Sequence, residues 1–166
     1  RLGEAVRLKT ISTREDPAAN SDQFLQLQKL LQTRYPSAHA AMKREVVGDL
    51  SLLYTWEGSD TKARPIMLMA HQDVVPIAPG TDKDWKVEPF SGVLQDGFVW
   101  GRGSWDNKGN LIAQMEALEM LAASGFKPQR SIYLVAGADE EIGGLRGAKR
   151  IAALLEHHAT SAQQLF

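Results

Sequence analysis

Residues 65–73 read Pro-Ile-Met-Leu-Met-Ala-His-Gln-Asp. The five residues after the proline, 66–70, are apolar at every position, which is typical of a central strand that is covered on both faces of a sheet. His71 and Asp73 follow at a spacing of two, and residues two apart in extended chain point the same way. The stretch therefore predicts a buried strand whose end delivers an imidazole and a carboxylate to one side of a sheet edge.

On the C-terminal side of this strand, the hydrophobic pattern alternates between the periods of strands and helices. The predicted elements are a hairpin turning at Asp96-Gly97, a helix over 111–123, a strand over 131–136 and a last helix after Gly144. This order favours an α/β fold: a mixed, largely parallel twisted sheet with helices on both faces and ligands at the carboxyl ends of the strands.

On the N-terminal side, we expect a short helix within 2–11 and a second helix capped by Asn20 or Ser21 and stopped by Pro36. Residues 44–47 and 51–56 read as two strands that turn at Gly48-Asp49. Residues 74–92 form a long loop, and loops of that length are usually functional or disordered.

Composition excludes several classes of function. The chain has 166 residues, which suits one ordinary domain, and its formal net charge of −1 gives no general electrostatic case for nucleic acid or an anionic membrane as partner. Cysteine is absent, so disulfide scaffolds, thiolate metal sites and cysteine nucleophiles are excluded. No apolar run approaches the ~20 residues that cross a bilayer.

Three polar clusters follow predicted strands or the hairpin. His71-Gln72-Asp73 is compatible either with local turn hydrogen bonds or with a metal-ligating histidine oriented by a carboxylate. In the glycine-rich stretch 101–109, Asp106 either caps the helix that starts near Lys108 or projects into a cleft. In 139–144, adjacent carboxylates belong either to an acidic first helical turn or to a metal site.

Together, the clusters place a histidine, an aspartate and two glutamates at successive strand ends, where a parallel arrangement brings them into one cleft. Histidine with carboxylates and no thiolate suits Zn²⁺, with Mn²⁺ or Co²⁺ as substitutes. A carboxylate that is not a ligand can then act as the base in metal-assisted hydrolysis.

The sequence resembles the M20 metallopeptidases, and within them the carboxypeptidase S-like and N-acyl-amino-acid hydrolase branch. The matching stretches are residues 69–76, Trp85 with 89–92, 97–109, and 138–144 with 147–148. The resemblance implies hydrolysis of the amide bond in C-terminal peptides or N-acyl amino acids. It also implies two zinc ions that share a bridging water.

Carried over residue by residue, the resemblance makes His71 a ligand of one zinc, Glu141 a ligand of the other, and Asp106 a bridge between them. Glu140 becomes the general base, and Asp73 orients the His71 imidazole. The resemblance also implies that the Asp106–Asn107 peptide bond is cis.

The family pattern needs two more ligands, an acidic residue on a following strand and a distant histidine, and it includes a lid domain that mediates dimerisation. We find none of these in the sequence, because His157 and His158 lie on the last predicted helix. We therefore expect residues 1–166 to be the N-terminal portion of a single catalytic domain, inactive by itself.

Two alternatives remain at this point. The first is a non-enzymatic globular binding domain whose acidic clusters are helix caps. The second is a phosphate-binding loop at 101–109, although the Gly-x-x-x-x-Gly-Lys-Ser/Thr frame is missing there.

Overall fold

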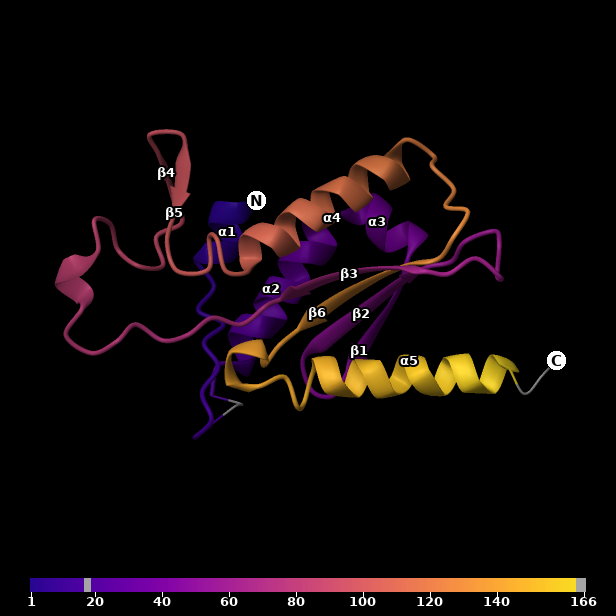
Figure 1. The fold of residues 1–166 in the computed structure, drawn as a ribbon. Coiled ribbons are helices and arrows are strands. Elements are labelled where there is room, and N and C mark those ends of the chain that lie inside the picture. Colours follow the sequence, from indigo (N-terminus) through magenta and orange to yellow (C-terminus); the bar gives the residue numbers. More distant parts are fainter. Residues whose placement is uncertain (17–18, 164–166) are drawn as a thin grey trace.

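A computed structural model describes residues 1–16 and 19–163 of the chain (Figure 1). Four strands form one mixed sheet in the order β1-β2-β6-β3. Their bounds are Lys43–Val47 for β1, Ser51–Trp56 for β2, Ile66–His71 for β3 and Ile132–Gly137 for β6. Strands β3 and β6 are parallel, and the other two pairings are antiparallel.

Helices cover both faces of this sheet (Figure 1). The bounds are Leu2–Val6 for α1, Ser21–Arg34 for α2, Pro36–Ala41 for α3, Lys108–Ala123 for α4 and Ala148–Gln163 for α5. The larger core lies on the face of α1 to α4, where Leu27, Leu111 and Leu134 are fully buried. A smaller cluster around Ile151 packs α5 against the opposite face. The mixed α/β architecture that we predicted is confirmed.

Two expectations about the sheet need correction. Among the strands of the described sheet, only β3 and β6 pair in parallel: a short turn after Val47 joins β1 and β2 as an antiparallel hairpin, and β2 is also antiparallel to β6. The apolar strand is also not central: β3 lies at the edge, with Met67 and Met69 about half exposed at 48% and 56%. An apolar run predicts a strand, but it does not say whether that strand is central or at the edge, because strand order depends on pairing with distant residues.

The remaining elements follow the sequence closely. Helix α2 starts after Asn20 and ends at Arg34, and Pro36 then opens the short helix α3, where its missing N–H costs nothing at the first helical position. Strands β4 (Val93–Gln95) and β5 (Phe98–Trp100) form the expected hairpin. Asp96 and Gly97 both have positive φ, as the tight turn requires.

Residues 74–92 cross the surface as the predicted long connection and contain one short 3₁₀ helix, η1 (Asp82–Asp84). A second 3₁₀ helix, η2 (Glu140–Ile142), follows β6. None of the helices described is both long and apolar enough to span a bilayer.

A buried lysine joins α4 to the N-terminus. Lys108, the first residue of α4, is completely buried. Its ammonium donates to the carbonyl oxygens of Ala5 at 3.0 Å and Leu8 at 2.5 Å. Burial lowers the pKa of this ammonium to about 7, although Asp73 opposes the shift. The two hydrogen bonds fix the end of α1 and the segment after it against the start of α4.

We expect Lys108→Ala to destabilise the chain by about 2–4 kcal/mol, because it removes both hydrogen bonds and leaves a cavity where the buried stem packs. Urea unfolding monitored by circular dichroism measures this loss. Lys29→Ala, at an exposed position of α2, is the control and should change stability by less than about 0.5 kcal/mol. Equal losses in the two variants would contradict the role given to Lys108.

Candidate metal centre

The parallel pair β3–β6 brings two of the three polar clusters together. In its register His71 is opposite Gly137, so β3 and β6 finish at the same end of the sheet. The residues after β3 and those after β6 therefore lie side by side, as expected at the carboxyl ends of parallel strands. The third cluster arrives just before α4, where the Asp106–Asn107 peptide bond is cis, as the family resemblance implied.

His71, Asp106 and Glu141 form a compact group. Each offers one ligand atom, and these atoms all lie within 4.8 Å of one another. His71 Nε2 is 3.0 Å from Asp106 Oδ1. His71 is buried, whereas Asp106 is exposed and Glu141 is half-buried. The group thus has a fixed, dry side at the imidazole and a side open to solvent at the carboxylates.

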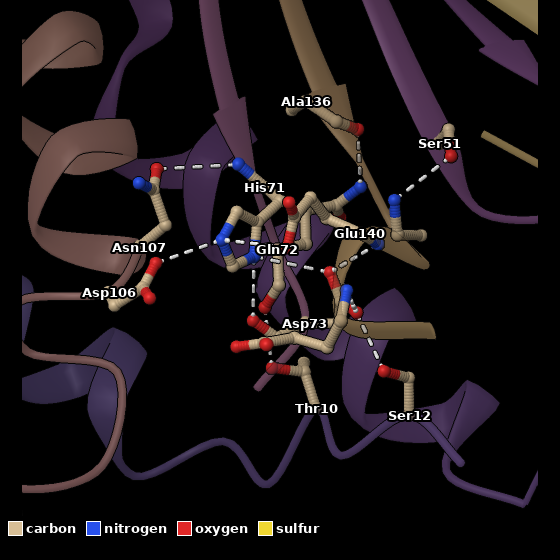
Figure 2. A network of polar contacts seen from close by, with 12 residues as sticks. Thr10, Ser12, Ser51, His71, Gln72, Asp73, Asp106, Asn107, Ala136 and Glu140 are labelled. Carbon is tan, nitrogen blue, oxygen red and sulfur yellow. Dashed lines mark hydrogen bonds and ion pairs between the residues drawn. The ribbon is translucent and has the colours of Figure 1, made fainter. Parts of the chain in front are cut away.

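Asp73 lies behind the imidazole and is completely buried. Its Oδ1 is 3.2 Å from His71 Nδ1 and accepts the backbone N–H of Glu140 at 3.1 Å. Its Oδ2 accepts the backbone N–H of Glu141 at 3.0 Å and the hydroxyl of Ser12 at 2.6 Å. Figure 2 shows His71 between Asp106 on one side and Asp73 on the other. The Asp73 carboxylate therefore holds both the imidazole of its own cluster and the backbone of Glu140 and Glu141 in the cluster after β6.

Glu140 reaches the same place from η2. Its Oε2 lies 3.7 Å from His71 Nε2, and its side chain is 59% exposed. The glutamate is thus close to the group of three without being held inside it, and its backbone is fixed by Asp73.

The charges of the group shift several pKa values. Burial disfavours the charged imidazole, but the hydrogen bonds and charge of Asp73 outweigh it and raise the pKa of His71 to about 9. Burial and the carboxylates of Asp73, Asp106 and Glu140 raise the pKa of Glu141, against the attraction of His71. Burial also acts to raise the pKa of Asp73, but hydrogen bonds hold it below its usual value. Crowded carboxylates of this kind are relieved by a cation.

Comparison with known proteins identifies the family. The sequence profile described as "Peptidase family M20/M25/M40" matches residues 67–166. The chain belongs to this family. The resemblance to M20 metallopeptidases that the motifs indicated is confirmed. Similar curated proteins also confirm the carboxypeptidase S-like and N-acyl-amino-acid hydrolase branch.

The chain is 44% identical over 162 residues to carboxypeptidase S of Saccharomyces cerevisiae. The aligned region covers 93% of this chain and 28% of that protein. It is 42% identical over 157 residues to N-fatty-acyl-amino acid synthase/hydrolase PM20D1 of Bos taurus. Here the aligned region covers 93% of this chain and 30% of that protein. The chain thus spans about three tenths of the length of these curated relatives.

Solved structures share the fold. The crystal structure of human carnosine dipeptidase 1 superposes with a TM-score of 0.70 at 21% identity, over 87% of this chain and 32% of that one. An M20 family metallo-carboxypeptidase from Sulfolobus solfataricus superposes with a TM-score of 0.67 at 23% identity, over 86% and 30% of the two chains. At these identities the likeness supports the architecture alone.

The donor set of the M20 chain fits a divalent cation. One imidazole nitrogen and several carboxylate oxygens are ligands that zinc accepts at ~2.0–2.2 Å. The three ligand atoms lie within 4.8 Å of one another, which is close enough for Asp106 to share a cation with either neighbour after small side-chain rotations. His71 Nδ1 faces Asp73, which leaves Nε2 directed toward the group, the arrangement that is common for metal-binding histidines.

The helix-cap alternative does not agree with these positions. Asn107 stands at the N-cap of α4, and no side chain caps that helix. The acidic residues Glu140 and Glu141 lie in η2, and α5 begins only at Ala148. Neither acidic cluster therefore caps α4 or α5, although Glu140 and Glu141 do form an acidic first turn of η2.

The phosphate-loop alternative fails at its lysine. A phosphate-binding lysine must reach into the loop, but Lys108 is buried with its ammonium on two backbone carbonyls. Gly103 explains part of the glycine content instead. Its φ is +86°, and a Cβ there would lie 2.7 Å from Val74 and 3.4 Å from the Lys108 stem. The glycine thus permits close packing of the loop over Lys108.

Sequence reasoning overlooked two polar partners of the centre. Ser12 binds Asp73, and Asn107 Oδ1 accepts the backbone N–H of His71 at 3.4 Å. The closely spaced hydroxyls of Thr10, Ser12 and Thr13 were the one signal for the first. His157 is exposed on α5, and the side chain of His158 lies outside the described residues.

We expect Asp73→Asn to destabilise the chain by about 2–4 kcal/mol, since an amide presents N–H groups to the buried donors that now share the carboxylate. Thermal and urea unfolding measure the loss. Asp82→Asn, an exposed aspartate in η1, is the matched control and should be near neutral. A near-neutral Asp73→Asn would show that the carboxylate is not needed to hold η2 against β3.

Proposed function

We propose that the chain carries the N-terminal part of the catalytic site of a metal-dependent hydrolase. Its substrates are peptides with a free C-terminal carboxylate or N-acyl amino acids. The observation that carries the proposal is the convergence of His71, Asp106 and Glu141, with Glu140 beside them. The names of the relatives support the substrate classes, because one is a carboxypeptidase and another hydrolyses N-fatty-acyl amino acids.

We assign the ligands to two zinc ions, for which Co²⁺ or Mn²⁺ can substitute. His71 would hold one ion and Glu141 the other, and Asp106 would serve both. When bound, such ions supply Lewis acidity, which polarises the scissile carbonyl and makes water a better nucleophile. Asp73 keeps the imidazole oriented, with its Nδ1 toward the buried carboxylate and its Nε2 toward the ions.

Glu140 is the proposed general base. Its carboxylate is exposed at the open side of the group, 3.7 Å from the imidazole, so it can approach both water and substrate. It takes a proton from the attacking water and passes it to the leaving amine. The hydrogen bond from its backbone N–H to Asp73 keeps η2 in place while the side chain moves the proton.

We further propose that the site is completed by residues outside 1–166. With the ligands assigned above, each zinc has two protein ligands, which is below the three usual at catalytic zinc. The chain then belongs to a catalytic domain whose other part supplies one acidic residue and one histidine.

The two glutamate roles can be separated by mutation in a protein that extends this chain through the complete catalytic domain. Glu140→Gln should reduce turnover of an N-acyl amino acid by at least about a hundredfold, because it removes the base, and leave zinc content unchanged. His71→Ala should instead lower zinc content, with His157→Ala as control. Metal analysis and amide hydrolysis assays measure the two effects, and normal turnover by the glutamine variant would remove Glu140 from its role.

The 166-residue chain itself should bind Zn²⁺ weakly and hydrolyse no N-acyl amino acid, since its ligand set is incomplete. The extended protein should be active, and chelation should abolish that activity. Calorimetric zinc titration and product chromatography, run on both proteins at equal concentration, check this. Equal zinc-dependent activity of the two would contradict the assignment of the missing ligands.

A further inference from the structure

The segment between α1 and α2 runs alongside the end of β3. The Thr10 hydroxyl donates to the carbonyl of Gln72 at 2.7 Å, and the Thr10 carbonyl accepts the backbone N–H of Val74 at 3.0 Å. The backbone N–H of Ser12 donates to the Val74 carbonyl at 3.3 Å, and Ile11 forms a parallel bridge with Val74. Residues 10–12, which we call the N-terminal segment, are therefore held in register with the chain that carries Asp73.

Ser12 uses its side chain differently from Thr10. Both residues are buried, with exposed fractions of 3% and 0%. The Thr10 hydroxyl binds a backbone carbonyl, whereas the Ser12 hydroxyl donates to Asp73 Oδ2 at 2.6 Å (Figure 2). The same oxygen accepts the backbone N–H of Glu141. Ser12 thus contacts the one carboxylate that joins the imidazole to η2.

We propose that Ser12 is a positioning residue of the metal centre, acting through Asp73. The inference rests on the proposed function, because it assigns Ser12 to that same centre. The other described partners of the carboxylate, namely His71, Glu140 and Glu141, belong to the centre itself. Ser12 comes from a separate part of the chain and donates a hydrogen bond to the carboxylate from outside the centre.

The N-terminal segment that carries Ser12 is held by hydrogen bonds on both sides. Asn20 Nδ2 donates to the Ile11 carbonyl at 2.9 Å, next to Ser12 and just before α2. Lys108 donates to the Leu8 carbonyl from the start of α4. The Ser12 hydroxyl is therefore positioned by α2 and α4, and it fixes the rotation of the Asp73 carboxylate relative to these helices. Loss of the hydroxyl removes this restraint on the carboxylate, leaves the contacts with His71, Glu140 and Glu141, and removes no expected metal ligand.

The test compares Ser12→Ala with Thr10→Val in this chain. Both variants remove one buried hydroxyl from the N-terminal segment at nearly constant shape, but only Ser12 touches Asp73. Calorimetric titration with Zn²⁺ measures the affinity of the centre. Hydrogen exchange of the Glu140 and Glu141 backbone amides, measured without metal, reports on the carboxylate that they bind. Ser12→Gly, which also lacks the hydroxyl and adds no metal-binding group, replaces Ser12→Ala if the alanine variant does not fold.

Ser12→Ala should raise the dissociation constant for Zn²⁺ about tenfold and speed exchange of both amides, as expected for the loss of a group that orients a ligand. Thr10→Val should leave both quantities within about twofold of the wild type. Equal effects in the two variants, or no effect of Ser12→Ala, would overturn the inference and show Ser12 to be structural only.

The same experiment separates this inference from the proposed function. If the wild-type chain and the extended protein bind no divalent cation, the proposed metal centre fails. The amide exchange comparison still decides whether Ser12 holds Asp73 in place. If the wild type binds Zn²⁺ and Ser12→Ala binds it equally well, the role of Ser12 fails and the proposed function stands.

Discussion

The arrangement of the centre depends on one buried carboxylate. A negative charge without access to water is costly unless donors surround it, and Asp73 is fully buried. Its donors come from three segments: the imidazole of His71, the backbone amides of η2, and the hydroxyl of Ser12. Because each segment satisfies part of the same charge, none can move away alone without leaving that charge short of a partner.

The sheet provides the frame for this carboxylate. Parallel pairing of β3 with β6 sends both chains out at one edge, so the polar residues of 71–73 and 139–141 meet although about 70 positions separate them in the sequence. Asp106, just before α4, completes the group next to the imidazole. Backbone topology thus accounts for the meeting of the three clusters, and side-chain hydrogen bonds account for their orientation.

Much of this could be predicted from the sequence because the signals are local. Turn residues such as Asp96-Gly97, the apolar periodicity of α4 and the polar residues ending β3 each act within a few positions. The five predicted site residues also lie near one another in the structure. The edge position of β3 was missed because strand order depends on distant pairing, and Ser12 was missed because its partner is 61 positions away. Burial of Lys108 was likewise invisible, since a lysine after glycines and an aspartate reads locally as a surface residue.

The exposed edge of β3 has a consequence for how the chain behaves in solution. Its backbone is covered by side chains at two points: Asn110 and Gln114 donate to the carbonyl of Met69, and Asn107 accepts the backbone N–H of His71. Apolar side chains remain open along the rest, at Ile66, Met67 and Met69. An uncovered apolar edge is a template for strand addition between molecules. Self-association of concentrated samples should therefore begin at β3, and a charged residue in place of Met67 is the change best suited to keep the chain dispersed.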